Sequence, residues 1–285
     1  MIRAAPATPA LPSVLERIVA AKRDELAATK ARASQDEVER LAAGAPDPLP
    51  FARALVEKQV ALIAEIKRAS PSKGDFAPSM VAEDLARVYA ANGAACCSVL
   101  TDAHFKGTLD DLRRVRAAVQ VPLLRKDFLF EPYQLYEARA AGADAVLLIV
   151  SVLGEVAALR SLIELARRLG LDSLIEVHDA AEVQTALEAG ALLVGINNRD
   201  LHTFQTDRAT TARLRPLIPH DIPVVSESGI FTAAHVQELA AQHVQAVLVG
   251  EALVMAPDPA AKVRELAGAS SAGPAVCPMP GGEPR

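Results

Sequence analysis

Eight short apolar runs, each followed by an amphipathic segment, constrain the fold of this chain more than any other feature. The runs are ALIAEIK (61–67), ACCSVL (95–100), VPLLRK (121–126), DAVLLIV (144–150), DSLIEV (172–177), LLVGIN (192–197), IPVVSES (222–228) and AVLVG (246–250). Most are continuously apolar until their last residues, which is typical of strands covered on both faces, as in a parallel sheet. We therefore predict eight parallel strands.

The segments between these runs carry helix start and stop signals. Thr108, Asp179 and Thr232 are predicted N-caps, and Pro132 suits the first position of a helix. A glycine of the kind that ends helices precedes three of the runs, in ANGAACCSVL, AAGADAVLLIV and EAGALLVGI. Eight such units in series, with no long break for a second domain, predict an α/β protein built as a single (β/α)8 (TIM) barrel.

Extra helices are expected before the barrel. Residues 11–33 have helical spacing, Ser34 with Glu37 forms a capping-box pattern, and FARALVEK (51–58) suggests a third helix. We predict three parts: residues 1–60 as a helical arm packing on the barrel, 61–267 as the barrel, and 268–285, rich in Gly and Pro, as a disordered tail. The arm either stabilises the barrel only or covers one of its mouths.

Composition excludes several classes of function. The net charge of −5 and the lack of a Lys/Arg block argue against nucleic acid as a partner, and the absence of Trp leaves little for base stacking. Because no stretch of about 18 apolar residues is present, we expect no membrane association. The three cysteines fit a reducing compartment, and the N-terminus lacks the apolar core of a secretory signal. We expect a cytoplasmic protein.

Polar and ionisable residues gather at the ends of the predicted strands. Glu65 and Lys67 lie two positions apart, so both side chains point to the same side of an extended chain. Other strands end in Lys126, Glu176, Asn197, Arg199, Glu227 and Ser228. In a (β/α)8 barrel the C-terminal ends of the strands form the active site, so we expect these groups to converge at one mouth.

Each residue also has a purely structural interpretation. Glu65 and Lys67 could form an ion pair that closes the barrel mouth. Lys126 could be solvated in a loop or pair with Asp127, and Glu176 could be a hydrogen-bonded carboxylate of the core. These interpretations weaken together, because all of the groups are expected on the same face, where burial without partners is costly.

Two glycines predict a phosphate site. Gly229 in SESGI and Gly250 in LVGEAL follow the seventh and eighth strands, where many barrels bind phosphate with backbone N–H groups. Either glycine alone could simply form a tight turn. The six histidines show no metal-ligand spacing, and no dinucleotide-binding motif is present. We therefore expect proton transfer by Lys and Glu without a metal or cofactor.

Seven segments together carry a family resemblance. They are LIAEIKRASPSKGDF, VLTDAHFKGTLDDL, PLLRKDFLFEPYQLYEARAAGADAVLLIV, LIEVHD, VGINNRDLHTF, VVSESGI and VLVGEAL. In this order they resemble the indole-3-glycerol-phosphate synthase family, over about residues 11–263. The resemblance implies a carboxy-lyase of tryptophan biosynthesis that closes the ring of 1-(2-carboxyphenylamino)-1-deoxyribulose 5-phosphate and releases carbon dioxide and water. It also leaves open an association with other enzymes of that pathway.

The resemblance further implies roles for single residues. Lys126 matches the general acid that protonates the substrate ketone, and Glu176 a base or electrostatic stabiliser. Glu65 and Lys67 match an acid–base pair that assists dehydration. Substrate-binding residues are Ser70, Asn197, Arg199, Glu227 and Ser228, with Phe105, Phe128 and Leu147 as an apolar pocket and Gly229, Gly250 and the amide of Glu251 as a phosphate cradle. We expect the clustered cations to lower the lysine pKa values toward neutrality, against the opposing effect of the neighbouring acids.

The sequence is also compatible with three other functions. An isomerase acting on phosphoribosyl-anthranilate would need a Cys or Asp acid–base pair, and Cys96 and Cys97 lie deep in the second strand. A Schiff-base aldolase could use Lys126 or Lys67. A phosphosugar-binding barrel without chemistry would not need the acid–base set.

Overall fold

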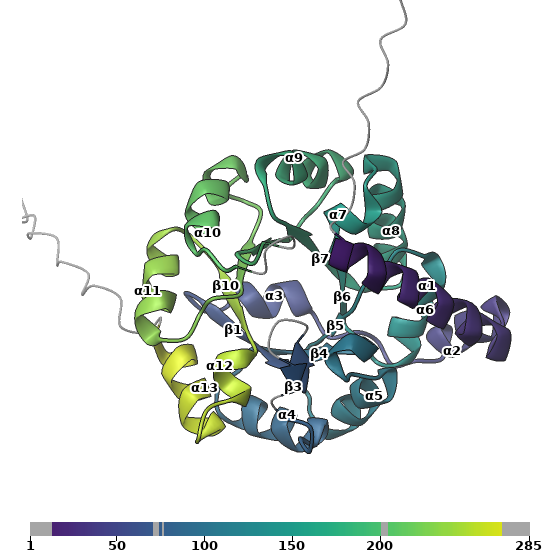
Figure 1. Ribbon diagram of the computed structural model, residues 1–285, viewed down its shortest axis with the longest axis horizontal. Coiled ribbons are helices and arrows are strands. Elements are labelled where there is room, and N and C mark those ends of the chain that lie inside the picture. Colours follow the sequence, from purple (N-terminus) through teal and green to yellow (C-terminus); the bar gives the residue numbers. More distant parts are fainter. Residues whose placement is uncertain (1–12, 71–73, 76, 201–204, 270–285) are drawn as a thin grey trace, which may run out of the picture.

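The computed structural model describes residues 13–70, 74–75, 77–200 and 205–269, and its eight parallel strands close into a barrel (Figure 1). The strands are β1 (Ala61–Ile66), β4 (Cys96–Leu100), β5 (Leu123–Lys126), β6 (Ala145–Ile149), β7 (Asp172–Val177), β8 (Val194–Asn197), β9 (Val224–Glu227) and β10 (Ala246–Val249). They follow one another around the barrel in chain order, and β1 closes it by pairing with both β4 and β10. This confirms the predicted (β/α)8 barrel.

Helices surround the strands on the outside (Figure 1). They are α4 (Ala82–Ala91), α5 (Leu109–Ala118), α6 (Pro132–Ala140), α7 (Val150–Leu153), α8 (Val156–Arg168), α9 (Ala180–Ala189), α10 (Ala209–Leu214), α11 (Ala233–Ala241), α12 (Glu251–Val254) and α13 (Pro259–Gly268), with short turns η1 (Ala103–Phe105) and η2 (Arg215–Leu217). Thr108, Asp179 and Thr232 cap their helices through side-chain hydrogen bonds, as predicted. Every helix in the described part of the chain is too short or too polar to span a lipid bilayer.

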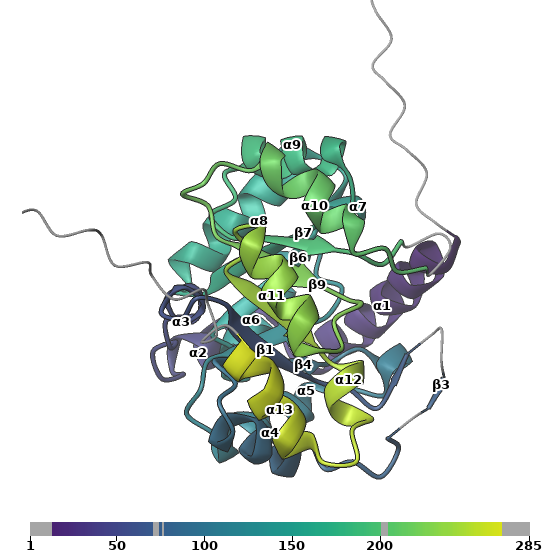
Figure 2. The same ribbon diagram turned by 90° about the vertical axis from the view of Figure 1, so that its left-hand side faces the viewer.

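Three N-terminal helices precede the barrel: α1 (Ser13–Arg32), α2 (Gln35–Ala43) and α3 (Phe51–Val56). Figure 2 shows α1 and α3 at opposite ends of the barrel. On α3, Phe51 and Leu55 are fully buried and pack against the apolar residues that fill the barrel interior. The amide of Ala52 donates to Asp172 Oδ2 at 2.8 Å, which fastens α3 to the start of β7. Helix α3 therefore closes the N-terminal end.

The alternation of side chains along each strand determines which residues reach the opposite mouth. The inward-facing apolar residues include Ile63, Leu124, Leu174, Val225 and Leu248. Two positions further along the same strands, and therefore on the same face, come Glu65, Lys126, Glu176, Glu227 and Gly250. The packed interior thus ends in a layer of polar residues and one glycine.

Two of the predicted segments extend beyond the residues that the structure describes. Most of the tail predicted to be disordered, residues 270–285, lies outside the described residues, as do residues 201–204 of the loop after β8. After β1, residues 69–70 (β2) pair antiparallel with Gly74–Asp75 (β3). The described part of the loop after β1 thus forms a short two-stranded ribbon that includes Ser70.

Candidate active site

A cavity opens at the C-terminal mouth of the barrel, and all of the predicted site residues line it. They are Glu65, Lys67, Ser70, Phe105, Lys126, Phe128, Leu147, Glu176, Asn197, Arg199, Glu227, Ser228, Gly229, Gly250 and Glu251. Val14, Leu15 and Ile18 of α1 also line it. The arm therefore reaches this mouth with one helix while α3 closes the other end.

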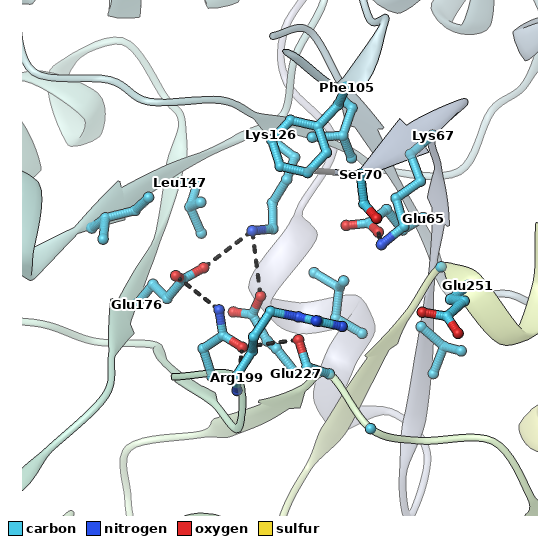
Figure 3. Close-up of a pocket in the computed structure, with 18 of the residues that line it drawn as sticks. Glu65, Lys67, Ser70, Phe105, Lys126, Leu147, Glu176, Arg199, Glu227 and Glu251 are labelled. Carbon is cyan, nitrogen blue, oxygen red and sulfur yellow. Dashed lines mark hydrogen bonds and ion pairs between the residues drawn. The ribbon is translucent and has the colours of Figure 1, made fainter. Parts of the chain in front are cut away.

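Lys126 lies among carboxylates from other strands (Figure 3). Its Nζ is 3.1 Å from Glu176 Oε2 and 3.6 Å from Glu227 Oε2. Burial alone would lower the pKa of Lys126, but the charges of Glu176, Glu227 and Glu65 outweigh burial and raise it. The expectation of a lysine pKa lowered toward neutrality is therefore wrong for Lys126, because carboxylates rather than cations surround this amine.

Glu176 has a different set of contacts at each of its two oxygens. Its Oε2 faces Lys126, while Oε1 accepts a hydrogen bond from Asn197 Nδ2 at 3.1 Å and lies 3.2 Å from His178 Nε2. Burial raises the pKa of Glu176, but Lys126, His178 and Asn197 together depress it well below its usual range. The side chain is therefore ionised at neutral pH.

Glu227 is in the opposite protonation state. Its side chain is buried, and its Oε1 has no hydrogen-bond partner among the described residues. Burial is the largest influence on its pKa, and although Lys126 lowers the pKa, the nearby Glu176 and Glu65 add to the effect of burial, giving a pKa of about 8. The mouth thus holds an ionised and a neutral carboxyl group side by side.

Space for the Glu227 carboxyl group comes from a glycine on the neighbouring strand. A Cβ on Gly195 of β8 would lie 2.3 Å from Glu227 Oε1. Gly195 occupies the inward-facing position two residues before Asn197. Any larger residue at this position would displace the carboxyl group from the barrel interior.

The opposite side of the mouth carries the Glu65–Lys67 pair. Lys67 Nζ lies 2.5 Å from Glu65 Oε2, so the two residues form the ion pair allowed by their spacing. A Cβ on Gly250 would lie 2.2 Å from the same Glu65 oxygen and 3.0 Å from Lys67 Cε. Gly250 therefore also has a steric role, because it leaves room for this pair.

The loop after β9 bends sharply where it meets the cavity. Ser228 and Gly229 both have positive φ, +67° and +77°. Ser228 Oγ donates to Asn197 Oδ1 at 2.9 Å, and Asn198 Nδ2 donates to the Ser228 carbonyl at 3.1 Å. Asn198 is buried and accepts from the amide and hydroxyl of Thr211. Asn198 therefore supports a strained turn whose glycine lines the cavity.

Apolar side chains form the remaining wall of the cavity. The rings of Phe105 and Phe128 stack with centroids 6.5 Å apart and planes 29° from parallel. Leu147 of β6 and the α1 residues lie on the same cavity surface. The cavity can therefore accept a molecule with an aromatic part and a polar, anionic part.

A buried ion cluster behind Lys126 was not predicted from the sequence. Lys22 of α1 is 3% exposed, and its Nζ lies 3.0 Å from both Asp102 and Asp127. Asp127 also pairs with Arg125 and accepts a hydrogen bond from Thr101. Asp127 therefore pairs with Lys22 and Arg125 rather than with its neighbour Lys126, and it links α1 to the end of β5.

Comparisons with known proteins identify the family of this chain. A model of the family described as indole-3-glycerol phosphate synthase matches residues 15–266. The chain belongs to the indole-3-glycerol phosphate synthase family. A relative of that name from Dehalococcoides mccartyi is 49% identical over 258 residues, covering 89% of this chain and 99% of the relative. Another from Roseiflexus castenholzii is 50% identical over 266 residues, covering 90% and 98%.

Solved structures of lower identity share the fold of this indole-3-glycerol phosphate synthase family member. A 3-hexulose-6-phosphate synthase superimposes with a TM-score of 0.59 at 16% identity, covering 74% of this chain and 99% of that chain. Thiamine phosphate pyrophosphorylase from Pyrococcus furiosus gives a TM-score of 0.57 at 17% identity, covering 75% and 96%. At these identities the likeness concerns the barrel alone.

Proposed function

We propose that this chain converts 1-(2-carboxyphenylamino)-1-deoxyribulose 5-phosphate to indole-3-glycerol phosphate in tryptophan biosynthesis. One observation carries the proposal beyond family membership: Lys126 and Glu176 meet at 3.1 Å inside a cavity with an aromatic wall. The cavity also holds the two glycines that follow the seventh and eighth barrel strands. This substrate has an aromatic ring, a ketone and a phosphate, which match the three kinds of surface.

Ring closure begins with attack of the ring carbon that bears the carboxylate on the ketone carbon. A carbon–carbon bond forms, and the ketone oxygen takes a proton from Lys126 and becomes a hydroxyl group. The raised pKa of Lys126 means that the amine carries its proton before the reaction. The carboxylate then leaves as carbon dioxide, which restores the aromaticity of the ring.

Dehydration completes the reaction. The hydroxyl group leaves as water, together with a proton from the neighbouring carbon, and the double bond of the indole forms. We assign this step to Lys67 and Glu65, which lie together at 2.5 Å as an acid and a base. The ionised Glu176 stabilises the positive charge that develops on the ring nitrogen as the hydroxyl group departs.

The other lining residues hold the substrate. Phe105, Phe128 and Leu147 receive the anthranilate ring, while backbone N–H groups at Gly229, Gly250 and Glu251 bind the phosphate. Glu227, neutral at pH 7, can donate a hydrogen bond to a substrate oxygen as well as accept one. Ser70, Asn197, Arg199 and Ser228 orient the remaining polar groups. Positioning of this kind brings the ring carbon and the ketone into attack distance.

The proposal is tested by adding the synthetic substrate to purified protein and following the appearance of indole fluorescence. We expect turnover without added metal or cofactor. Failure of folded protein to form indole-3-glycerol phosphate would refute the proposal. In that case, turnover of phosphoribosyl-anthranilate would indicate an isomerase, and borohydride trapping of a carbonyl substrate on Lys126 or Lys67 would indicate an aldolase.

We place the activity in the cytoplasm, and we expect that any association with other enzymes of tryptophan biosynthesis would appear as co-purification from the native cell. Isolation of the chain without those enzymes under gentle conditions would argue against such a complex.

A further inference from the structure

The ring of His178 lies between two carboxylates at the end of β7. Its Nε2 is 3.2 Å from Glu176 Oε1, and its Nδ1 is 3.0 Å from Glu182 Oε2. The same Glu182 oxygen accepts the backbone N–H of His178 at 2.7 Å. Glu182 belongs to the first turn of α9, so the helix holds both the backbone and the ring of His178.

This arrangement selects one charge state of the imidazole. A neutral imidazole would turn a nitrogen lone pair toward one of the two carboxylates, whereas an imidazolium presents N–H to both. Burial opposes the charged form, but Glu176 and Glu182 raise the pKa of His178 to about 10. The contact with Glu176 is an ion pair rather than a well-aligned hydrogen bond.

The contact with His178 affects which oxygen of Glu176 is available for chemistry. His178 and Asn197 both hold Oε1, which leaves Oε2 directed at Lys126. The other charged groups that act on His178 or Glu176 are Glu182 on α9, Lys126 on β5 and Glu227 on β9. His178 does not line the cavity, so it acts on the substrate only through Glu176.

We propose that His178, held as an imidazolium by Glu182, is a positioning residue that fixes Glu176 in its ionised form with Oε2 toward Lys126. The inference rests on the proposed function of this site. It explains why a buried carboxylate stays charged beside a neutral one. Glu176 has a cation in contact with each of its oxygens, whereas Lys126 lies at the longer distance of 3.6 Å from Glu227. It also makes α9 part of the support for the active site.

The experiment compares His178→Ala, His178→Gln and Glu182→Gln with matched controls. The first control is Glu188→Gln, because Glu188 lies on the same helix but is exposed. The second control is His220→Gln, which replaces an exposed histidine in the segment preceding β9. We expect His178→Ala to lower kcat roughly ten- to hundredfold, by analogy with the loss caused by removing the partners that orient metal-binding side chains. KM should change by less than about threefold, because no contact with the substrate is lost.

Two readouts separate positioning from a merely structural role. Loss of His178 removes a group that lowers the Glu176 pKa, so the acidic limb of the kcat–pH profile should move to higher pH. His178→Gln, which keeps a hydrogen-bond donor, should recover part of the kcat lost in His178→Ala. Circular dichroism should first show that His178→Ala and Glu182→Gln are folded. If both folded variants then have the kcat and the acidic limb of the wild type, the proposal is overturned.

A second measurement does not depend on turnover. In nitrogen NMR spectra of the wild-type protein, both ring nitrogens of His178 should remain protonated through neutral pH, and Glu182→Gln should lower its titration midpoint. Ordinary titration near pH 6.5 would refute the imidazolium. If the wild type made no indole product while His178 stayed doubly protonated, the proposed function would fail but the held ion pair would stand.

Discussion

Lys126 on β5 and Glu176 on β7 are 50 residues apart in the chain, yet Lys126 Nζ lies 3.1 Å from Glu176 Oε2. The barrel brings them together because both occupy inward-facing positions at the C-terminal ends of their strands. The pair has two consequences: it keeps Lys126 protonated before the substrate arrives, and it keeps Glu176 ionised. The acid and the charge-stabilising group therefore set each other's protonation state.

Removing the amine of Lys126 tests its role as the general acid. Lys126→Met keeps most of the side-chain volume, and we expect kcat to fall by on the order of a hundredfold or more, as is typical when a general acid is lost. Lys58→Met, at an exposed lysine before β1, should leave kcat unchanged. Steady-state kinetics with the carboxyphenylamino substrate decides the matter, and near-normal turnover by Lys126→Met would show that another group donates the proton.

The pKa of Glu227 predicts an effect of pH on stability. An unfolded Glu has a pKa of about 4.5, whereas burial raises that of folded Glu227 to about 8. Between these values the unfolded chain releases the proton and the folded chain keeps it, so Glu227 makes folding progressively less favourable as pH rises through this window. Glu227→Gln cannot titrate, and we expect its Tm to exceed that of the wild type by an amount that grows from about pH 5 to about pH 8.

Thermal unfolding of both proteins across this pH range provides the measurement. Glu188→Gln, an exposed position on α9, should follow the wild type at every pH. If the Tm difference between Glu227→Gln and the wild type stays constant with pH, folded Glu227 is already ionised at the acidic end of this pH range.

The sequence was sufficient to predict the barrel and the residues at its mouth, for a physical reason. Parallel strands all end at the same edge, so polar residues that end apolar runs must meet there. The ion pair between Glu65 and Lys67 was also predictable, because residues two positions apart on a strand point to the same side. Helix starts such as Thr108 were also predictable, because a cap depends on residues only three positions apart.

Contacts that depend on tertiary packing were not predictable in this way. Lys22 looks like a surface residue of an amphipathic helix until α1 is placed against Asp102 and Asp127. The direction of the Lys126 pKa shift was predicted wrongly, because the sequence shows that cations and acids meet but not which of them lie closest.

Gly250 allows a test of the tight packing around the Glu65–Lys67 pair. Gly250→Ala would place a Cβ 2.2 Å from Glu65 Oε2, so the pair must move. We expect kcat to fall and KM for the phosphorylated substrate to rise, each by about tenfold or more, since small displacements at a reacting centre are costly. Gly268→Ala, where no atom lies within 4 Å of the added Cβ, is the matched control and should leave both constants unchanged. Equal kinetics for the two variants would contradict the geometry described for Gly250.

Closure of the barrel by α3 predicts a difference between two leucines. Leu55 of α3 is fully buried against the barrel interior, whereas Leu41 of α2 is 54% exposed. Leu55→Ala should lower the free energy of unfolding by roughly 2–5 kcal/mol, because it removes buried apolar contacts and leaves a cavity. Leu41→Ala should change it by less than about 0.5 kcal/mol. Urea unfolding midpoints measure both effects, and similar midpoints for the two variants would show that α3 is not an integral part of the barrel core.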